Sequence, residues 1–543
     1  TIRTYLDDVE VESSTSSSLL SLGLLSDRAR IGFYTTQPFN KIRLESNTVG
    51  LLVNVTIYYA EVMKFEAAPP LTCNVPTVMN RPEFPLTVST GGSLIGSVTD
   101  PENAVDANTT NYASLGVLVA GSASLAIKDE VSSYPANTYV GFDIENTTIL
   151  SLELLENITI RTYLDGALAE TQAGAGQLAS LGLLGSTASR IGFVTTQAFD
   201  EVEITISSAG LDLGTTRVYN AVIQCFTAGP ALTNCNEPTL LTNPTYPVYI
   251  SERTGITGLL NANSEIVDAA NVIDANTTNF AELNFLATVA SEISLGVRDA
   301  VSTYPAGTYV GFDIEKSASL LNLNLLNSLT ITSYLDGVQQ QSMSGSALIL
   351  GADLLSGNNR QTVGFVTSTP VDEVVITLDG DLAGVSLGNT RVYGAIFQCF
   401  TAGPGLAACN TYTIPTAPDY PLTISQVGIT GAVCASCDIT NTNNIIDSDP
   451  NNYAELNFTA AVGATMTVGV KDQISEYPSG TFAGFDIENT ASLLDLGVLN
   501  SITISTYQNG VLQESSTGAN LAIGATLDRK STRLNSSHKV QSR

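Results

Sequence analysis

The chain has 543 residues, of which 14% are charged, with 52 acidic and 22 basic side chains and a formal net charge of −30. A chain this acidic repels phosphate groups and shows no basic stripe with aromatic residues, which argues against nucleic acid or an anionic membrane surface as a partner. No apolar run approaches the roughly 18 residues that a membrane-spanning helix needs. Hydrophobic residues make up 43% of the chain, which predicts sizeable buried cores and argues against disorder.

One sequence block, GFDIE, occurs three times, beginning at Gly141, Gly311 and Gly484. Repeats that build solenoids are about 20–50 residues long, so a period of 170 and then 173 residues indicates a whole domain copied in tandem. Alignment of the copies predicts four repeats: the C-terminal part of one (1–74), two complete ones (75–235 and 236–409), and the N-terminal part of a fourth (410–527).

The pattern within a repeat is that of consecutive strands. EVEITIS (Glu201–Ser207) and EVVITL (Glu373–Leu378) alternate apolar and polar residues, as half-buried strands do. The Asp-Gly pairs that follow Tyr163 and Tyr334 predict hairpin turns. Since no alternation of strands with long helices is visible, we expect an all-β fold of tandem antiparallel β-sandwich domains of jelly-roll type.

Two leucine-rich runs allow more than one local structure. They are SLLSLGLLS at residues 18–26 and SLLNLNLLN at residues 319–327. Periodicity does not separate a short helical turn from a buried strand in runs of this length. Both alternatives stay open.

A motif rich in side-chain oxygens recurs in three repeats. It reads VDANTTNYA at Val105–Ala113, IDANTTNFA at Ile273–Ala281 and IDSDPNNYA at Ile446–Ala454. Hard cations such as calcium prefer several oxygen ligands from one tight loop. The alternative is a network of Asx turns that needs no metal.

The motif resembles the A-x-D-G-x-x-x-T-x-W signature of galactose-binding-like (discoidin-type) jelly rolls, whose loop commonly holds a structural calcium. The chain departs from that signature, with Ala or Ser in place of Gly and Tyr or Phe in place of Trp. The resemblance implies calcium as a cofactor and the following ligands: Asp106, Asn108, Asp274, Asn276, Asp447 and Asp449.

The GFDIE block places two carboxylates two residues apart, hence on one face of a strand. The pairs are Asp143 and Glu145, Asp313 and Glu315, and Asp486 and Glu488. Paired carboxylates can hydrolyse glycosides, but a pair from one strand that recurs in every repeat favours a structural role. A further shared block contains Arg217 and Arg391, and we expect each to form an internal ion pair in so acidic a repeat.

The seven cysteines predict disulfides. Nine residues separate Cys225 from Cys235, and nine separate Cys399 from Cys409. Both pairs recur, so we expect a local disulfide in each, with two separate buried thiols as the alternative. A disulfide that closes an 11-residue loop would stabilise the fold by roughly 3 kcal/mol.

The other three cysteines have no recurring partner. Lys64 stands where the leading copy would carry its first cysteine, which leaves Cys73 as an expected free thiol. Cys434 and Cys437 form a CxxC motif without a second CxxC or a histidine, so we expect a local disulfide and no redox or zinc site. This cysteine usage predicts an oxidising location, extracellular or at a cell surface.

The last 16 residues, Asp528–Arg543, have no counterpart in the other copies. Their back-translation resembles a sequencing-library adapter, so we expect an artefact, with a genuine basic tail as the alternative. Without this segment 17 basic and 51 acidic residues remain, a net charge of −34, and the only histidine, His538, is gone. A chain without histidine lacks the base of Ser-His-Asp and Cys-His sites and the ligands of zincins, so we expect no enzyme here.

The long, acidic, lysine-poor repeats resemble repeat regions of secreted or surface proteins of Bacteroidota-type bacteria with adhesin-like use. The resemblance implies a non-catalytic structural or adhesive segment whose partners are extracellular or cell-surface glycans or proteins. The alternative is a tandem array of carbohydrate-binding modules that gains by avidity, with or without a catalytic domain outside this sequence. The absence of tryptophan counts against this alternative, because sugar platforms often use it.

Overall fold

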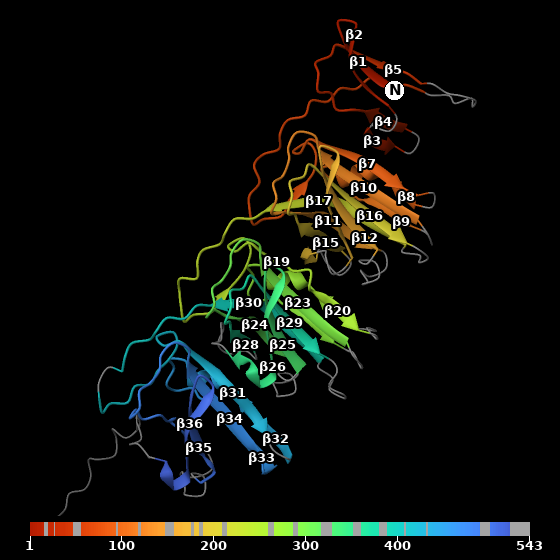
Figure 1. The fold of residues 1–543 in the computed structure, drawn as a ribbon. Helices are drawn as coiled ribbons and strands as arrows, with labels where there is room; N and C mark the ends of the chain where they lie inside the picture. The colour runs from red at the N-terminus through yellow and green to blue at the C-terminus, as the bar shows by residue number, and fades with distance from the viewer. Residues whose placement is uncertain are drawn as a thin grey trace, which may run out of the picture. The chain divides into compact units, whose positions relative to one another are not determined.

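The computed structural model, many of whose strands are labelled in Figure 1, divides into two compact parts, Thr1–Gln473 and Ile474–Arg543. Strands and short 3-10 helices make up the regular structure, which confirms the predicted all-β class. The structure describes residues 1–15, 20–25, 28–46, 56–93, 96–117, 121–146, 157–174, 179–183, 188–208, 214–258, 265–285, 291–316, 328–350, 360–379, 388–406, 409–430, 433–488 and 500–521.

The leading residues form two small sheets. The first has the order β2-β1-β5, with β1 at Ile2–Leu6, β2 at Val9–Ser14 and β5 at Lys41–Leu44. In the second, β3 (Leu20–Leu25) pairs with β4 (Arg28–Gly32). Residues 20–25 of the first leucine-rich run therefore form a strand, whereas the second run, at 319–327, lies outside the described residues.

The first complete repeat contributes strands to two antiparallel sheets, of which the second continues into the following repeat where Ser180 pairs with Ile250. The five-stranded sheet β13-β12-β16-β10-β7 comprises β7 (Leu86–Gly92), β10 (Gly121–Asp129), β12 (Ile158–Leu164), β13 (Ala167–Ala173) and β16 (Glu201–Ser208). The other, in the order β14-β15-β11-β17-β9-β8, comprises β8 (Gly96–Thr99), β9 (Ala113–Val117), β11 (Thr138–Asn146), β14 (Ala179–Leu183), β15 (Ala188–Val194) and β17 (Thr215–Cys225). β6 (Thr77–Met79) also pairs with β17, and the 3-10 helix η1 spans Pro101–Ala104.

One hydrophobic core unites the two sheets of this repeat. Leu125 and Ile204 come from the five-stranded sheet, Phe142 and Ile144 come from the other, and all four are fully buried in the same cluster. Along β16, buried residues alternate with partly exposed ones, as the sequence predicts. A shared core between two antiparallel sheets is the arrangement of a β-sandwich.

The second complete repeat has the same strand order. Its first sheet, β26-β25-β29-β23-β19, comprises β19 (Val248–Ile250), β23 (Ser291–Asp299), β25 (Leu329–Leu335), β26 (Val338–Ser344) and β29 (Glu373–Asp379), and β20 (Gly255–Gly258) pairs with β23. Its second sheet, β21-β22-β30-β24-β28-β27, comprises β21 (Glu265–Val267), β22 (Ala281–Phe285), β24 (Tyr309–Lys316), β27 (Ile349–Leu350), β28 (Arg360–Val366) and β30 (Gly388–Gln398), with β18 (Thr239–Leu240) on β30. The 3-10 helices are η2 (Ala269–Val272) and η3 (Gly345–Ala347).

The remaining elements follow the second repeat. Up to Gln473 they are β31 (Leu422–Thr430), β32 (Val433–Thr440), η4 (Thr442–Ile445), β33 (Glu455–Val462) and β34 (Thr465–Asp472). The second compact part contains β35 (Thr503–Gln508), β36 (Val511–Thr517) and η5 (Gly518–Asn520). The predicted artefact at Asp528–Arg543 lies outside the described residues.

The hairpin turns have the backbone that the Asp-Gly pairs predict. Between β12 and β13, Asp165 has φ 51° and Gly166 has φ 77°. Between β25 and β26 the values are 49° for Asp336 and 76° for Gly337. Two consecutive positive φ angles match the twist of the flanking strands, and Asp-Gly adopts them at low cost.

The glycine of GFDIE lies where two strands approach each other closely. Gly141 of β11 faces Gly192 of β15, and a Cβ on Gly141 would lie 2.1 Å from the carbonyl oxygen of Ile191. The second repeat has the same pair, Gly311 and Gly364, with the corresponding distance 2.2 Å. The repeated glycines are therefore required by sheet packing.

Two disulfides join cysteines that are far apart in sequence, and they correct the predicted pairing. Cys73 is bonded to Cys225 and Cys235 to Cys399, with sequence separations of 152 and 164 residues. Their Cα atoms lie 4.6 Å apart in each case, within the usual range of about 4.4–6.8 Å. The predicted local disulfides Cys225–Cys235 and Cys399–Cys409 are wrong, and so is the expectation that Cys73 is free.

The backbone explains the correct pairing. Cys225 ends β17, and the N–H of Asn74 donates to its carbonyl oxygen over 2.8 Å, which places Cys73 beside it. Asn236 makes the same bond, also 2.8 Å, to Cys399. Cys409 is an exposed free thiol, contrary to expectation. The side chains of Cys434 and Cys437 lie outside the described ones, so their disulfide stays a prediction.

Candidate functional site

The Asp-containing motif forms a loop between a 3-10 helix and a strand, held by its own side chains. In the first repeat, Oδ1 of Asp106 accepts the N–H of Asn108 over 2.8 Å, and Oδ2 accepts Nδ2 of Asn111 over 2.8 Å. Oδ1 of Asn108 accepts the N–H of Thr110 at 3.1 Å and its hydroxyl at 2.7 Å. We call residues Val105–Ala113, and their equivalents Ile273–Ala281 and Ile446–Ala454, the Asp loops.

The other two Asp loops repeat these hydrogen bonds. Asp274 accepts from Asn276 N at 2.8 Å and from Asn279 Nδ2 at 2.7 Å. Asp447 accepts from Asp449 N at 2.9 Å and from Asn452 Nδ2 at 2.6 Å. Asx-type bonds to the backbone two residues later are a local consequence of this spacing, so the sequence specifies the loop geometry.

The Asp loops contain some, but not all, features of a calcium site. Each Asp oxygen in these bonds already accepts a hydrogen bond, as the Asx-turn alternative requires. One amide oxygen in each loop is buried and has no hydrogen-bond partner, and calcium is coordinated by such oxygens: Asn111, Asn279 and Asn452 Oδ1. The described residues contain no group of three or more acidic, His or Cys side chains that could hold a metal. Calcium therefore stays a prediction.

Arginines, carboxylates and aromatic rings gather beside the first Asp loop. Asp143 of β11 lies opposite Arg190 of β15, which donates through Nε at 2.6 Å and NH2 at 2.8 Å. Glu145 lies opposite Arg217 of β17, at 3.0 Å, and also accepts the hydroxyl of Tyr219. Both carboxylates of this GFDIE block are thus neutralised by arginines from the neighbouring strands.

The rings join this group to the Asp loop. Arg217 lies over the ring of Tyr112, with 4.6 Å to the centroid, and Tyr112 makes an edge contact with Tyr219 at 5.5 Å. Tyr112 itself belongs to the Asp loop, next to β9. We call this set the outer-face cluster of the first repeat: Tyr112, Asp143, Glu145, Arg190, Arg217 and Tyr219.

The second repeat contains an equivalent outer-face cluster. Arg360 donates to Asp313 through Nε at 3.0 Å and through NH2, and Arg391 pairs with Glu315 at 3.4 Å. The hydroxyl of Tyr393 donates to Glu315. The members are Phe280, Asp313, Glu315, Arg360, Arg391 and Tyr393.

The rings of the second cluster are packed like those of the first. Arg391 lies 4.5 Å from the ring centroid of Phe280, and Arg360 lies 3.6 Å from that of Tyr393. Arg360 also donates to the carbonyl oxygen of Thr277 at 2.9 Å, which ties the second Asp loop directly to the sheet.

Burial raises the pKa of two acidic groups of the second cluster, Asp313 and Tyr393. Burial raises the pKa of Asp313, although the hydrogen bond and charge of Arg360 act in the opposite direction. Burial, followed by the neighbouring Glu315, raises the pKa of Tyr393 to about 12. The hydrogen bond from Arg217 to Glu145 raises the pKa of that guanidinium. Tyr393 is therefore a neutral hydrogen-bond donor to Glu315 at neutral pH.

Each cluster has a closed core and an accessible rim. In the first repeat the side chains of Asp143 and Arg190 are 7% and 12% exposed, whereas those of Glu145 and Arg217 are 20% and 33% exposed. Tyr112 and Tyr219 are half-buried. A ligand can therefore approach the second ion pair and the ring of Tyr112.

These contacts confirm the ion pairs that the sequence predicts for Arg217 and Arg391 and support a structural role for the first two GFDIE pairs. The third pair, Asp486 and Glu488, is exposed and lies outside the strands. Sequence comparison missed Arg190 and Arg360, because they do not align. The block RIGF, which Arg190 shares with Arg30, was the available signal.

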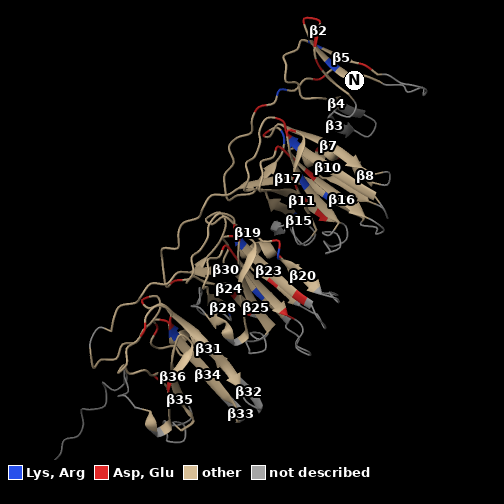
Figure 2. Ribbon diagram, in the orientation of Figure 1, with Lys and Arg blue, Asp and Glu red and all other residues tan. Residues whose placement is uncertain are grey.

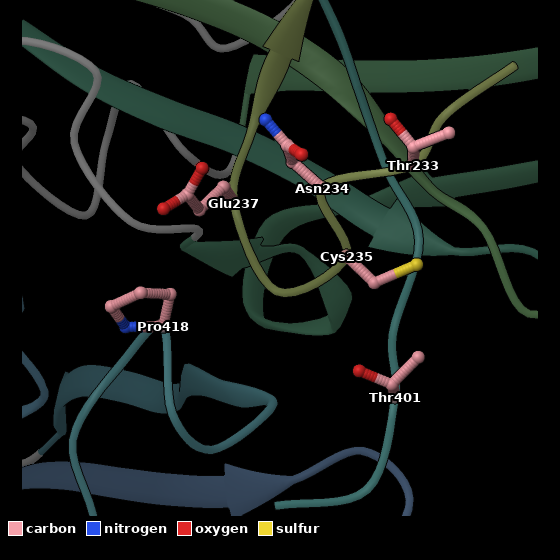
Figure 3. A pocket seen from close by; sticks show the side chains of 6 residues that line it. All are labelled: Thr233, Asn234, Cys235, Glu237, Thr401 and Pro418. Carbon is pink, nitrogen blue, oxygen red and sulfur yellow. The ribbon is translucent and has the colours of Figure 1, made fainter.

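One hollow lies next to the second disulfide and is shown in Figure 3. Its lining residues are Thr233, Asn234, Cys235, Glu237, Thr401 and Pro418. With Cys235 in a disulfide, Glu237 is the one ionisable side chain among them, so the hollow offers no acid–base pair. None of the described helices has the length and apolar character needed to cross a membrane.

No protein-family model matches the sequence, and no curated protein matches it. Similar solved structures include an allantoicase from Saccharomyces cerevisiae, with a TM-score of 0.22 and 10% identity over 56% of this chain and 89% of that one. A fucolectin from striped bass serum has a TM-score of 0.18 and 9% identity over 58% and 96%. A family 32 carbohydrate-binding module from C. perfringens, in complex with galactose, has a TM-score of 0.19 and 12% identity over 30% and 98%. TM-scores and identities this low assign no function to the chain.

Proposed function

We propose that the two complete repeats are non-catalytic glycan-binding modules and that the outer-face cluster is their binding site. The observation that carries the proposal is the recurrence of the cluster. Both repeats combine two arginines, two carboxylates and two aromatic rings next to an Asp loop. A purely structural ion pair does not require aromatic neighbours at a half-exposed rim.

The charge balance of the cluster favours a neutral ligand. Arg190 and Arg217 offset Asp143 and Glu145, so the group as a whole attracts neither anions nor cations strongly. The formal net charge of −30 also repels anionic ligands, although most of the ribbon in Figure 2 carries no charge. A sugar is neutral, and its hydroxyl groups both donate to carboxylates and accept from guanidinium groups.

The rim of the cluster presents complementary surfaces for a sugar. Glu145 and Arg217 supply an acceptor and a donor that are already held in place by each other, so binding requires little ordering of side chains. The rings of Tyr112 and, in the second repeat, Phe280 supply an apolar face for the C–H groups of the sugar ring. Binding sites commonly combine such apolar walls with a few fixed polar groups.

The proposal also covers the adhesive role and the location of the chain. Two binding sites in one chain bind a multivalent glycan surface more tightly than one, which suits an adhesive role of the kind predicted from the sequence. The disulfides support an extracellular or cell-surface location. Membership of a Bacteroidota-type surface protein remains part of the proposal.

Calcium is proposed as a structural ligand of the Asp loops, where Asp106, Asp274 and Asp447, with Asn108, Asn276 and Asp449, would hold it. A bound cation would neutralise the Asp carboxylates and hold the loop beside the cluster. We expect millimolar calcium to raise the melting temperature by a few degrees over a chelator-treated sample, because a ligand that binds only the folded state stabilises it. Equal melting temperatures in calorimetry would leave the Asx-turn network as the whole explanation.

Glycan-array binding by the full chain tests the proposed function. We expect binding to neutral glycans by the wild type and its loss, by at least tenfold in signal, in the double variant Arg217→Ala/Arg391→Ala. Arg161→Ala is the matched control, since Arg161 forms a half-exposed pair with Glu203 at 3.7 Å on the other sheet. Absence of binding by the wild type, or equal binding by the double variant, would contradict the proposal.

A further inference from the structure

We propose that the two complete repeats also act as a tension-bearing tether, in which a pulling force passes through the disulfides and bypasses the β-sandwiches. The proposal concerns the mechanics of the chain and does not depend on glycan binding. It rests on which residues the disulfides join and on the contacts beside them.

Each disulfide joins a cysteine just before one complete repeat to a cysteine at the end of that repeat's last long strand. Cys73 precedes β6 and Cys225 is the last residue of β17, so every strand from β6 to β17 lies between the bonded cysteines. Cys235 and Cys399 enclose β18 to β30 in the same way. Tension that arrives at the first cysteine therefore crosses directly to the second through covalent bonds, and the enclosed strands carry none of it.

The segment between the two disulfides is short. Nine residues, Phe226–Asn234, separate Cys225 from Cys235. Fully extended they span roughly 30 Å, since a chain reaches at most about 3.3–3.6 Å per residue. The covalent path through both repeats thus contains little chain that tension can draw out.

Hydrogen bonds hold the two ends of each repeat together next to the disulfide. The side chain of Asn74 donates to the carbonyl oxygen of Thr227 at 3.0 Å and accepts the N–H of Thr227 at 2.9 Å. Asn236 makes the same two contacts with Thr401, at 3.1 and 2.9 Å. Both asparagines are 5% exposed, so water competes little for these bonds.

The same asparagines reach the following repeat. Asn74 donates to the carbonyl oxygen of Pro244 at 3.1 Å, and Asn236 to that of Pro418 at 3.0 Å. Figure 3 shows Thr401 and Pro418 near Cys235. Each asparagine therefore joins the residues beside its disulfide to the start of the following repeat, on the line along which tension travels.

The disulfides determine how far the chain can lengthen. Without them, unfolding of the first repeat would release the 152-residue separation, roughly 500 Å of chain, and unfolding of the second would release 164 residues, roughly 550 Å. With them, this length stays enclosed even if a sandwich unfolds. Local disulfides of the type Cys225–Cys235 would leave the sandwiches in the path of the force.

Single-molecule pulling on the full chain, held at its two ends, tests the proposal. The oxidised wild type should lack the two steps of roughly 500 and 550 Å that the enclosed strands would release, whereas steps from residues 1–72 and 400–543, which lie outside the disulfides, occur in all conditions. Dithiothreitol, which reduces each disulfide to two thiols and is oxidised to its cyclic disulfide, should add one step of roughly 500 Å and one of roughly 550 Å. An equal number of steps of this size before and after reduction would overturn the proposal.

Two variants sharpen the result. Cys225→Ser should show the step of roughly 500 Å without reductant while the second repeat stays closed. If this variant does not fold its first repeat, the same length appears as initial slack, which the reduced wild type distinguishes from an unfolding step. Cys409→Ser removes the exposed free thiol and is the matched control, which should behave as the wild type does. An extension of Cys225→Ser equal to that of the oxidised wild type would also overturn the proposal.

Discussion

The two complete repeats neutralise the same carboxylate with arginines from different positions. In the first repeat Arg190 lies directly opposite Asp143. In the second, Thr362 lies opposite Asp313, and Arg360 lies opposite Glu315, two residues further along the strand. Its side chain nevertheless reaches back to Asp313. The two repeats thus share the interaction and not the position, because a long arginine side chain can reach one buried carboxylate from two places on the neighbouring strand.

The difference has a structural consequence. Arg360 also binds the carbonyl oxygen of Thr277 in the Asp loop and lies over the ring of Tyr393, and its side chain is 5% exposed against 12% for Arg190. Arg190 gives both of its contacts to Asp143. Both repeats therefore couple the Asp loop to the sheet through an aromatic ring, Tyr112 or Phe280, and the second repeat adds the hydrogen bond from Arg360 to the loop.

The largest effect is expected from the removal of a disulfide. It tests whether the two repeats depend equally on their disulfides for stability. Cys225→Ser and Cys399→Ser should each destabilise their own repeat by about 5 kcal/mol, because the enclosed loops of 152 and 164 residues have nearly equal closure entropies. Denaturant unfolding followed by repeat-specific proteolysis measures both. Losses that differ by more than about 2 kcal/mol would show that the loop lengths do not set the stability.

The next largest effect is expected from substitution of Arg360 or Arg190, which tests the difference between these two arginines. Arg360→Ala should destabilise the second repeat by about 3–5 kcal/mol, since it leaves Asp313 buried without its partner. Arg190→Ala should cost the first repeat about 1 kcal/mol less, because no bond to an Asp loop is lost with it. Calorimetry of the two variants measures both losses of stability.

A second substitution controls for the buried charge. Asp313→Asn added to Arg360→Ala removes the uncompensated carboxylate and should recover about half of the lost stability. No recovery would mean that packing, not charge, explains the effect of Arg360.

The smallest effect concerns pH and a buried carboxylate on the other sheet. Burial raises the pKa of Glu373 to about 7, despite Arg253 at 3.1 Å, and raises that of its counterpart Glu201 to about 6. Both values exceed the unfolded value of about 4.3, so the folded state binds the proton more tightly. Proton binding to these two carboxyl groups stabilises the folded state. This stabilisation is complete below pH about 4.3 and is lost as the pH rises through about 6 for Glu201 in the first repeat and about 7 for Glu373 in the second.

We expect a loss of about 2 kcal/mol for the second repeat between pH 4.5 and pH 8, and a smaller loss for the first. Glu373→Gln, which cannot ionise, should flatten the profile of the second repeat only. The measurement is the unfolding free energy at several pH values. A profile of Glu373→Gln as steep as that of the wild type would exclude Glu373 as the cause.

Local features of the chain were predictable from sequence, and long-range pairings were not. The alternation in Glu201–Ser208 and the Asp-Gly turn at Asp165 are determined by neighbouring residues, so pattern alone identifies them. The disulfides depend on which strand ends meet in space. In a tandem repeat, Cys225 has one candidate nearby in sequence and another one repeat earlier, and spacing alone favours the wrong one.

The sequence did contain a signal for the correct disulfides. Cys73 persists although Lys64 replaces the cysteine before it, which local pairing does not explain but a bond to Cys225 does. The outer-face cluster shows the same limit: Arg217 and Arg391 align and were found, whereas Arg190 and Arg360 shift by two residues and were missed. Alignment of the repeats identifies residues at equivalent positions, but it does not identify an equivalent contact that is made from a shifted position.

The most direct test of the proposed function is the number of glycan sites per chain. Isothermal titration of the full chain with a neutral glycan selected on the array should give two equivalent sites, one per outer-face cluster. Arg217→Ala should leave one site and Arg391→Ala the other. A stoichiometry of two that neither variant changes would contradict the assignment of the sites to these clusters.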